Sequence, residues 1–387
     1  MSNPELLKRR RRPASDLAAP LQQLDRTHVL MDGRSLAYFA GCDYYRLSSH
    51  PSLVRAVHAG LDEFGLNVAA SRKTTGNHVL YGELESALAR FFRVESATLT
   101  SNGYMSNLCL AQSLAGEVTH ALIDARAHSS LHDAVKLLGC PAFVFQHRNP
   151  ADAGRLARRC GRRARIVLLT DGLFSHSGEV APIEQYRAEL PPSAIIAIDD
   201  AHGAGVLGRN GRGTVEYLRA KSERIIRTIT LSKAFGSYGG AILGPAALRR
   251  RITERSRYFI GNTPLPLPLA KAALIALQLV QDDPSLRRRL TVHTAYVKAA
   301  LRDAGIPVND GPGPIVPIHP KSAQAARRLS GALLKAGIHP PFIQYSAAEH
   351  AYFRFVISSE HEAGQLDRLI ETLLTHRIPV VVPPRDS

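Results

Sequence analysis

The stretch Thr228-Ile-Thr-Leu-Ser-Lys-Ala-Phe-Gly236 places Lys233 directly after an apolar segment that begins at Ile225. That segment predicts a buried strand, and glycines follow the lysine at positions 236, 239 and 240. An amine at the end of a buried strand costs free energy unless it is paired or covalently engaged. One such engagement is a Schiff base with a carbonyl cofactor, in which a desolvated lysine acts as the nucleophile. The alternative is an ordinary loop lysine after an edge strand, and this stretch alone does not separate the two.

The bulk composition is that of a globular protein. The chain has 387 residues, 45% of them hydrophobic, and a mean hydropathy of -0.10, which allows one large domain and a smaller one. No apolar run reaches the roughly 20 residues of a membrane span, and no apolar stretch follows the basic N-terminus as in a secretory signal. The four cysteines show no CxxC spacing, so we expect reduced thiols in a cytoplasmic protein.

The formal charge of +16 is concentrated in short basic runs. Such runs could bind nucleic acid, or an acidic partner such as coenzyme A or an acyl carrier protein. The alternative is a solvated, arginine-rich surface. No helix-turn-helix, zinc-finger or aromatic-basic RNA motif accompanies the charge, so nucleic acid is the weaker hypothesis. The runs lie at 8–12, 158–165, 249–251 and 287–289.

Apolar strands alternate with helices through the middle of the chain. This alternation predicts an α/β fold with a mainly parallel central sheet covered on both faces. Chemistry in such sheets collects at the carboxyl ends of the strands, where Asp124, Asp171, Asp199 and Lys233 fall. The expected strands are 97–100, 121–124, 142–145, 166–170, 194–199 and 225–230, with helices at 82–92, 104–114, 129–138 and 155–160.

The pattern changes twice, which predicts three parts. Residues 1–47 are expected to form a basic, partly helical arm and a hairpin around Asp32-Gly33. Residues 48–263 form the large domain, which opens with a helix at Pro51 capped by Ser49 or His50. After a proline-rich break, residues 264–387 form a smaller α+β domain. Its expected elements are helices at 270–281, 323–336 and 361–375 and strands at 314–318 and 353–357.

The segment Asp199-Asp200-Ala201-His202-Gly203 follows a strongly apolar strand. A carboxylate there suits a protonated pyridine nitrogen, and a turn could aim His202 at the same ring. The alternative is a helix cap by Asp200 beside a satisfied core aspartate. The run Gly203-Ala-Gly-Val-Leu-Gly208 fits GxGxxG, but no helix follows it, so a dinucleotide site is not expected.

Two further features concern His128 and the turn Ser101-Asn-Gly103-Tyr104. His128 and His132 could share a helix face as metal ligands, but no third ligand is evident, so no metal is expected. His128 could instead stack on a flat cofactor, or simply begin a helix. The Ser101–Tyr104 turn enters a helix, and its amides could hold a phosphate.

In order and spacing, Asp-Asp-Ala-His-Gly-Ala-Gly-Val-Leu-Gly followed by Thr-Leu-Ser-Lys-Ala-Phe-Gly resembles the α-oxoamine synthases. These pyridoxal-phosphate (PLP) enzymes have fold type I, that of aspartate aminotransferase, and include 8-amino-7-oxononanoate synthase and serine palmitoyltransferase. The resemblance extends from about Asp32 to Leu374. Further matching segments are Ser71-Arg72, Leu84-Glu85, Ser101 to Asn107, Phe174-Ser175, Gly178 to Pro182, and Arg354.

The resemblance implies roles for individual residues. Lys233 would carry PLP as a Schiff base, Asp199 would pair with the pyridine nitrogen, and His202 would bond the ring hydroxyl. His128 would stack on the ring, and these four are the implied catalytic residues. The other implied contacts are Ser175 near the ring, Gly103, Tyr104 and Thr230 at the phosphate, Thr263 reaching across a homodimer interface, and Arg354 clamping the amino-acid carboxylate.

The implied reaction condenses a small amino acid with an acyl-CoA or acyl-carrier-protein thioester and releases CO2. Two alternatives stay open: an aminotransferase or retro-aldol lyase of the same fold, and a non-catalytic, basic nucleic-acid-binding protein. Several positions depart from the family pattern while the cofactor residues are intact, so the amino acid and the acyl chain are not predicted. The departures are Cys42 and Tyr45-Arg46 in the family's Asn-Asp-Tyr-Leu-Gly, Tyr81 for a histidine, Asp171 for a glutamate, and the segment Gln344 to His350.

Overall fold

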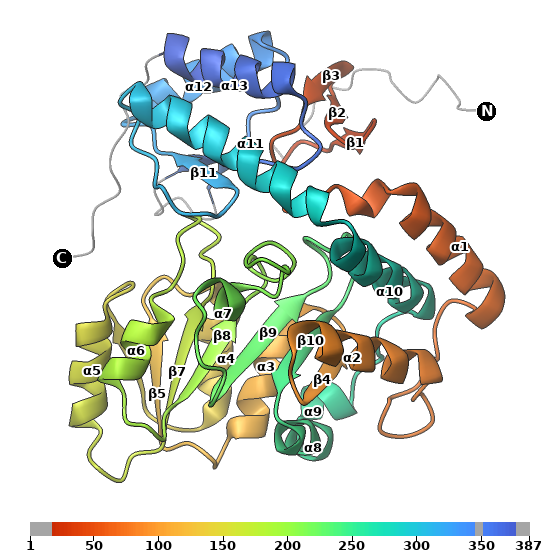
Figure 1. The fold of residues 1–387 in the computed structure, drawn as a ribbon, viewed down its shortest axis with the longest axis vertical. Coiled ribbons are helices and arrows are strands. Elements are labelled where there is room, and N and C mark those ends of the chain that lie inside the picture. Colours follow the sequence, from red (N-terminus) through yellow and green to blue (C-terminus); the bar gives the residue numbers. More distant parts are fainter. Residues whose placement is uncertain (1–17, 345–350, 377–387) are drawn as a thin grey trace.

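The computed structural model describes residues 18–344 and 351–376. Figure 1 shows a large body around a central sheet and a smaller one built from α11, α12, α13 and β11, with the first strands beside it. The central sheet has seven strands in the order β4-β10-β9-β8-β7-β5-β6, in which only β10 runs antiparallel to its neighbours. Their bounds are β4 Ser96–Thr100, β5 His120–Asp124, β6 Ala142–Phe145, β7 Ile166–Asp171, β8 Ile195–Asp199, β9 Ile225–Thr230 and β10 Gly240–Gly244.

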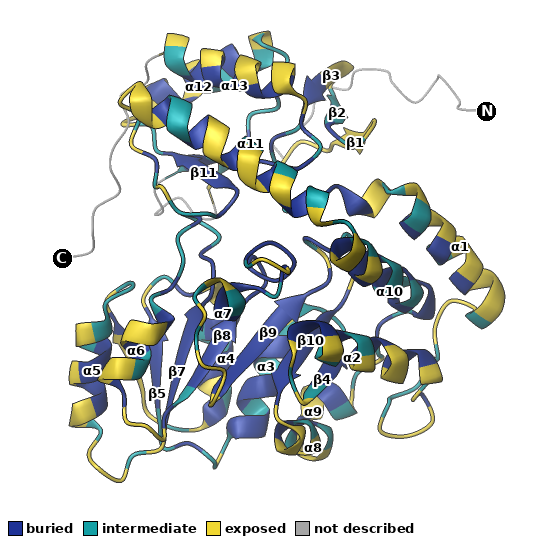
Figure 2. Cartoon of the chain, viewed as in Figure 1, coloured by how far each residue is buried: buried dark blue, intermediate teal, exposed yellow. Residues whose placement is uncertain are grey.

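Successive residues of the inner strands pack on opposite faces of this sheet. Ile123 and Leu169 belong to a core with α3 and α4, whereas Leu122 and Leu168 pack with α5 and α6. Figure 2 accordingly shows the strands buried and the outer sides of α5 and α6 exposed. The predicted mainly parallel α/β sheet is confirmed. The covering helices are α3 Gly103–Leu114, α4 Ser129–Val135, α5 Pro150–Arg159, α6 Ile183–Glu189, α7 Thr214–Tyr217, α8 Ala246–Arg255 and α9 Arg257–Ile260.

A third hydrophobic core packs three helices against the edge of the sheet formed by β4 and β10. The helices are α1 Pro51–Phe64, α2 Val79–Phe92 and α10 Leu267–Asp282. His50 caps α1, as one of the two expected cap residues, by accepting the amide of Ser52 at 3.2 Å. Proline stands at the first turn of both α1 and α10, where its missing N–H has no helical partner to lose.

The smaller body has a three-stranded antiparallel sheet in the order β11-β13-β12. The predicted hairpin joins its core through Ala37 and Phe39, and its turn puts Asp32 and Gly33 at φ 48° and 76°, as the Asp-Gly pair predicts. The division of the chain at residues 47 and 263 remains a prediction. The elements are β1 Gln22–Gln23, β2 His28–Met31, β3 Arg34–Ala37, α11 Pro284–Asp303, β11 Ile315–Ile318, α12 Ala323–Lys335, β12 Phe342–Ile343, β13 Tyr352–Val356 and α13 Ala363–Thr375.

Several expectations about elements were wrong or incomplete. The described part of the N-terminal arm, from residue 18, contains the short strand β1 and no helix, and residues 1–17 lie outside the described chain. Helix α11 was not predicted, because its arginines at 287–289 interrupt the apolar spacing. Strand β10 was not predicted either, because glycines bound it. A Cβ at Gly240 would lie 2.5 Å from the backbone of Asn102, so this strand needs glycine to pass beneath the start of α3.

Two motifs of the family resemblance meet in a buried ion pair. The guanidinium of Arg72 donates to both carboxylate oxygens of Glu85, at 2.5 and 3.1 Å, and the two side chains are 7% and 4% exposed. Glu85 also accepts the amide of Leu99 on β4 at 2.9 Å and pairs with Arg249 at 2.7 Å. The pair therefore joins the loop around Arg72, helix α2, strand β4 and helix α8.

We expect Glu85→Ala to lower the free energy of unfolding by about 3–5 kcal/mol, because it leaves the Arg72 charge buried without its partner. Urea denaturation measures the change. Glu83→Ala removes an exposed glutamate one position before Leu84 and should change stability by less than about 0.5 kcal/mol. A loss at Glu85 as small as that at Glu83 would show that the ion pair does not hold these elements together.

Candidate active site

The carboxyl ends of β7, β8 and β9 form the floor of a cavity of about 200 Å³. The parallel register places Asp171 beside Asp199 and Asp199 beside Thr228, so the polar residues that end neighbouring strands meet at one edge. The lining residues are Asn102, Gly103, Tyr104, His128, Ser130, Asp171, Asp199, Ala201, His202, Thr230, Ser232 and Lys233.

The Asp199 carboxylate is held by donors on both oxygens. The side-chain amide of Asn107 on α3 donates to Oδ2 at 2.6 Å, and the amide of Ala201 donates to Oδ1 at 3.0 Å. Asn107 is itself fixed, because its oxygen accepts the hydroxyl of Thr228 at 2.6 Å. Sequence reasoning placed Asn107 within a family motif without giving it a role, since its partner is distant along the chain.

Asp171 is a second carboxyl in the same floor, with a different environment. It is buried, and its Oδ2 accepts the backbone amide of His128 at 3.0 Å. Burial first, and the neighbouring Asp199 carboxylate second, raise the pKa of Asp171 well above its ordinary value. Asp171 therefore keeps its proton to a higher pH than a solvated carboxyl does.

Lys233 and His202 both line the cavity, and Nζ of the lysine lies 2.8 Å from Nε2 of the imidazole. Burial lowers the pKa of Lys233. Burial, and then the positive charge of Lys233, lower the pKa of His202 well below its ordinary value, so the imidazole is neutral. A desolvated amine beside a neutral imidazole has the character of a nucleophile or base rather than that of a surface lysine.

His128 caps helix α4, where its Nδ1 accepts the amide of Ser130 at 3.3 Å. Its ring opens onto the cavity, and burial lowers its pKa. The structure thus combines the two interpretations of this residue: it begins a helix and it borders the cavity. Within residues 18–344 and 351–376, no group of three His, Cys, Asp or Glu side chains is arranged to hold a metal ion, and His132 is not part of the cavity lining.

The predicted phosphate cradle is the start of helix α3. Asn102 caps this helix by accepting the amide of Met105 at 2.9 Å, so the other first-turn amides are free to meet an anion. A Cβ on Gly103 would lie 2.9 Å from Cβ of Thr230, so glycine lets the helix start touch β9. The hydroxyls of Thr230 and Ser232, 2.8 Å apart, add further donors.

Three predicted residues lie outside this lining. Arg354 is on β13 of the smaller body, and its charge lowers the pKa values of Lys233, His202 and His128. Ser175 lies in the loop after β7. Thr263 is exposed beside a separate cavity of about 20 Å³ that Ser101 also lines. The structure therefore brings seven of the ten predicted site residues into one cavity and places the charge of Arg354 nearby, while the individual roles remain predictions.

The departures from the family pattern fall in different places. Cys42 is not part of the cavity lining, but it acts on the pKa values of Tyr44 and Lys233. Tyr81 is buried in α2, where its hydroxyl donates to the carbonyl of Leu265 at 2.6 Å. The segment 345–350 lies outside the described residues.

The chain is similar to known proteins over most of its length. Residues 39–373 match the family model of aminotransferase class I and II. The chain is 36% identical to a putative 8-amino-7-oxononanoate synthase of Desulforudis audaxviator, over 92% of both chains, and 34% identical to the 8-amino-7-oxononanoate synthase of Thioalkalivibrio sulfidiphilus, over 89% of both. Its fold is similar to that of serine palmitoyltransferase from S. paucimobilis with bound PLP, with a TM-score of 0.87 at 22% identity over 93% and 92% of the two chains.

The raised pKa of Asp171 makes the stability of the chain pH-dependent. A carboxyl whose pKa rises on folding contributes stability that is present below its ordinary value and is lost as the pH rises through the folded value. Asp171→Asn keeps an oxygen for the His128 amide and removes this titration. The ordinary pKa of an aspartate is 3.8. As the pH rises above this value, we expect the free energy of unfolding of Asp171→Asn to increase relative to that of the parent protein.

Urea denaturation of both proteins without PLP, at a series of pH values, measures this difference. Asp303→Asn, at an exposed position at the end of α11, serves as the matched control and should give a flat difference. A flat difference at Asp171 as well would show that this carboxyl ionises freely in the folded chain.

Proposed function

The chain belongs to the aminotransferase class I and II family, and from this premise we propose that it is a PLP-dependent α-oxoamine synthase. It joins a small amino acid to the acyl group of a thioester and releases CO2 and the free thiol. The observation that carries the proposal is the half-buried Lys233 amine against His202, in a cavity that the Asp199 carboxylate and the start of helix α3 also line. The 8-amino-7-oxononanoate synthase name of its relatives supports the same reaction class.

The residues of the cavity fit PLP in three respects. The free first-turn amides of α3, with Thr230 and Ser232, offer the donor set that a phosphate requires. The fixed Asp199 carboxylate is the partner that a protonated pyridine nitrogen requires. Lys233 supplies the amine that would hold the carbonyl group covalently, and His202 lies against that amine to meet a ring hydroxyl.

When bound, PLP supplies an electron-withdrawing ring that stabilises negative charge at the α-carbon of an amino acid. The chain supplies the rest. The Lys233 amine, whose pKa burial lowers, can take the α-proton and return it. Asp199 holds a proton at the ring nitrogen, and Asn107 keeps that carboxylate aimed at it. Arg354 binds the carboxylate of the amino acid, a role suited to the planar guanidinium fork.

The overall reaction balances without an oxidant or reductant. A bond forms between the α-carbon and the acyl carbon, and the C–S bond of the thioester breaks to give the free thiol. The bond to the carboxylate then breaks to give CO2, and a proton replaces it. PLP, which the cavity fits, is the only cofactor that these reaction steps need.

The basic runs give little support to the nucleic-acid alternative, because much of their charge is used inside the molecule. Arg249 pairs with Glu85, Arg251 pairs with Glu117, and Arg289 pairs with Glu360. Arg287 is buried and donates to the carbonyl of Val280. Among the described helices, none is both long and apolar enough to cross a membrane.

A homodimer is part of the proposal. Thr263 is exposed beside a small cavity, where the family resemblance has it reach a neighbouring subunit. Four exposed apolar side chains between residues 54 and 79 also support a surface that a partner covers: Val54, Leu61, Leu66 and Val79. A cytoplasmic location is proposed from the cysteines, which form no disulfide with one another.

The direct test incubates the purified enzyme and PLP with glycine, alanine or serine and a panel of acyl-CoA and acyl-carrier-protein thioesters. We expect one pair to release free thiol and CO2 in equal amounts, and Lys233→Ala to release neither. Transfer of the amino group without thiol release would favour the aminotransferase alternative. Release of an aldehyde from a β-hydroxy amino acid would favour the lyase.

Arg354 offers a second test. We expect Arg354→Ala to raise the KM for the amino acid on the order of 10- to 100-fold, because one charge-assisted bidentate contact is lost. Arg354→Lys keeps the positive charge but not the planar guanidinium. Its KM for the amino acid should therefore lie between those of the parent enzyme and Arg354→Ala. Steady-state kinetics measures both, and an unchanged KM for the amino acid in Arg354→Ala would contradict the assigned role.

A further inference from the structure

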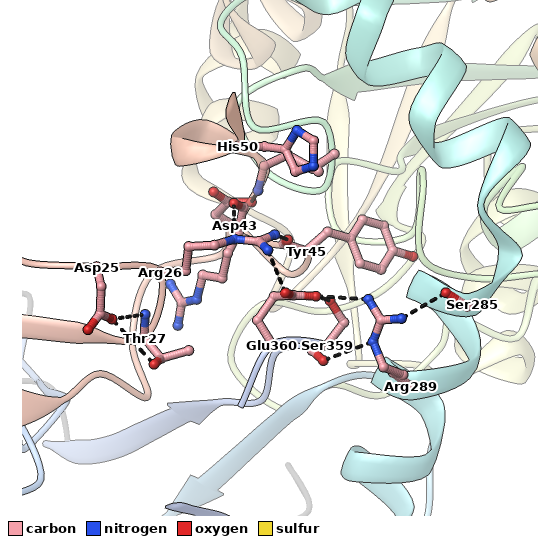
Figure 3. A network of polar contacts seen from close by, with 12 residues as sticks. Asp25, Arg26, Thr27, Asp43, Tyr45, His50, Ser285, Arg289, Ser359 and Glu360 are labelled. Carbon is pink, nitrogen blue, oxygen red and sulfur yellow. Dashed lines mark hydrogen bonds and ion pairs between the residues drawn. The ribbon is translucent and has the colours of Figure 1, made fainter. Parts of the chain in front are cut away.

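The short segment 42–46 is held in place from both bodies of the molecule. Figure 3 shows the guanidinium of Arg26 between Tyr45 and Glu360; it donates to the Tyr45 carbonyl at 3.0 Å and pairs with Glu360 at 2.6 Å. On the other side, Arg289 of α11 pairs with Glu360 at 2.9 Å. The segment is therefore a fixed platform rather than a free loop.

Two adjacent tyrosines on this platform point into the segment that follows β8. The Tyr44 hydroxyl lies 2.6 Å from Nδ1 of His202, and the Tyr45 hydroxyl donates to the carbonyl of Gly205 at the same distance of 2.6 Å. Both side chains are 0% exposed. They are alike in chemistry, burial and hydrogen-bond length, but only Tyr44 contacts a residue of the cavity.

The direction of the Tyr44 hydrogen bond follows from its surroundings. Burial raises the pKa of Tyr44, so the side chain is a neutral phenol with one proton to donate. Its two neighbours are the imidazole nitrogen of His202 and the sulfur of Cys42. Sulfur is a weaker acceptor than an imidazole nitrogen, so the phenol donates to Nδ1 of His202.

We propose that Tyr44 is a positioning residue that fixes His202 as the Nε2–H tautomer. With Nδ1 occupied as an acceptor, the ring proton sits on Nε2 and points at Nζ of Lys233, 2.8 Å away. That N–H needs a lone pair to donate to, so it favours the unprotonated amine. Tyr44 thus acts on Lys233 through His202.

The inference deepens the proposed function, and its catalytic value rests on that function, but the tautomer is a property of the chain itself. Other charged groups also act on Lys233 and His202, and a test must keep them constant. All of them remain in place when only Tyr44 changes: Asp171, Asp199, Arg354, His128, His176 and Cys42.

The first experiment reads the tautomer in the full chain, labelled with 15N-histidine, by NMR before and after PLP is added. The His202 resonances are assigned by their absence in His202→Gln. We expect Nε2 to carry the proton in the parent protein. A proton on Nδ1 would overturn the proposal, and this result does not depend on any Tyr44 variant folding.

The second experiment compares Tyr44→Phe with the matched control Tyr45→Phe. Each loses one buried hydrogen bond of the same length, so each should lose similar stability. In Tyr44→Phe, Nε2 becomes free to accept a proton from the lysine, and we expect the pKa of Lys233 to rise by about one unit. In Tyr45→Phe it should stay at the parent value.

The readout is the pH dependence of Lys233 modification by an amine reagent in the protein without PLP, quantified by peptide mass spectrometry. An unchanged midpoint in Tyr44→Phe, or equal shifts in both variants, would overturn the proposal. The enzyme could also show the expected tautomer and the expected rise of the Lys233 pKa but release no thiol from any thioester. That result would contradict the proposed function and leave this inference standing.

Discussion

The site depends on one costly arrangement: an amine, a neutral imidazole and two carboxyl groups share a buried edge of the sheet. Lys233 and His202 lie 2.8 Å apart, and Asp171 and Asp199 are paired in the register of neighbouring strands. Each of these polar groups loses favourable hydration free energy when it is buried. They are kept by fixed donors and acceptors, because the Asn107 amide, the Ala201 amide and the His128 amide hold the two carboxyls.

This constraint explains why the surrounding structure is so closely packed. Gly103 allows α3 to touch β9, and Gly240 allows β10 to pass beneath the same helix start. The Arg72–Glu85 pair joins α2 to β4 at the edge of the sheet. The smaller body contributes Glu360, which with Arg26 holds the platform that carries Tyr44. A misplaced neighbour would loosen the contact between the Lys233 amine and the His202 imidazole.

The sequence predicted the sheet and most of the cavity because these depend on local patterns. Apolar strands ending in Asp171, Asp199 and the Lys233 stretch identify the carboxyl edge, and the parallel arrangement brings those ends together. Asn107 and Tyr44 could not be given roles in this way. Each acts on a partner far along the chain, and only the folded structure shows that Asn107 meets Asp199 and Tyr44 meets His202. Helix α11 was missed because three arginines interrupt its apolar spacing, although one of them is buried.

We propose that Lys233 is the lysine that engages PLP, and the position of a reduced PLP adduct tests this proposal. The purified protein is incubated with PLP, reduced with borohydride and digested, and the modified peptide is located by mass spectrometry. We expect one stoichiometric adduct, on Lys233. Adducts spread over surface lysines, with Lys233 unmodified, would contradict it.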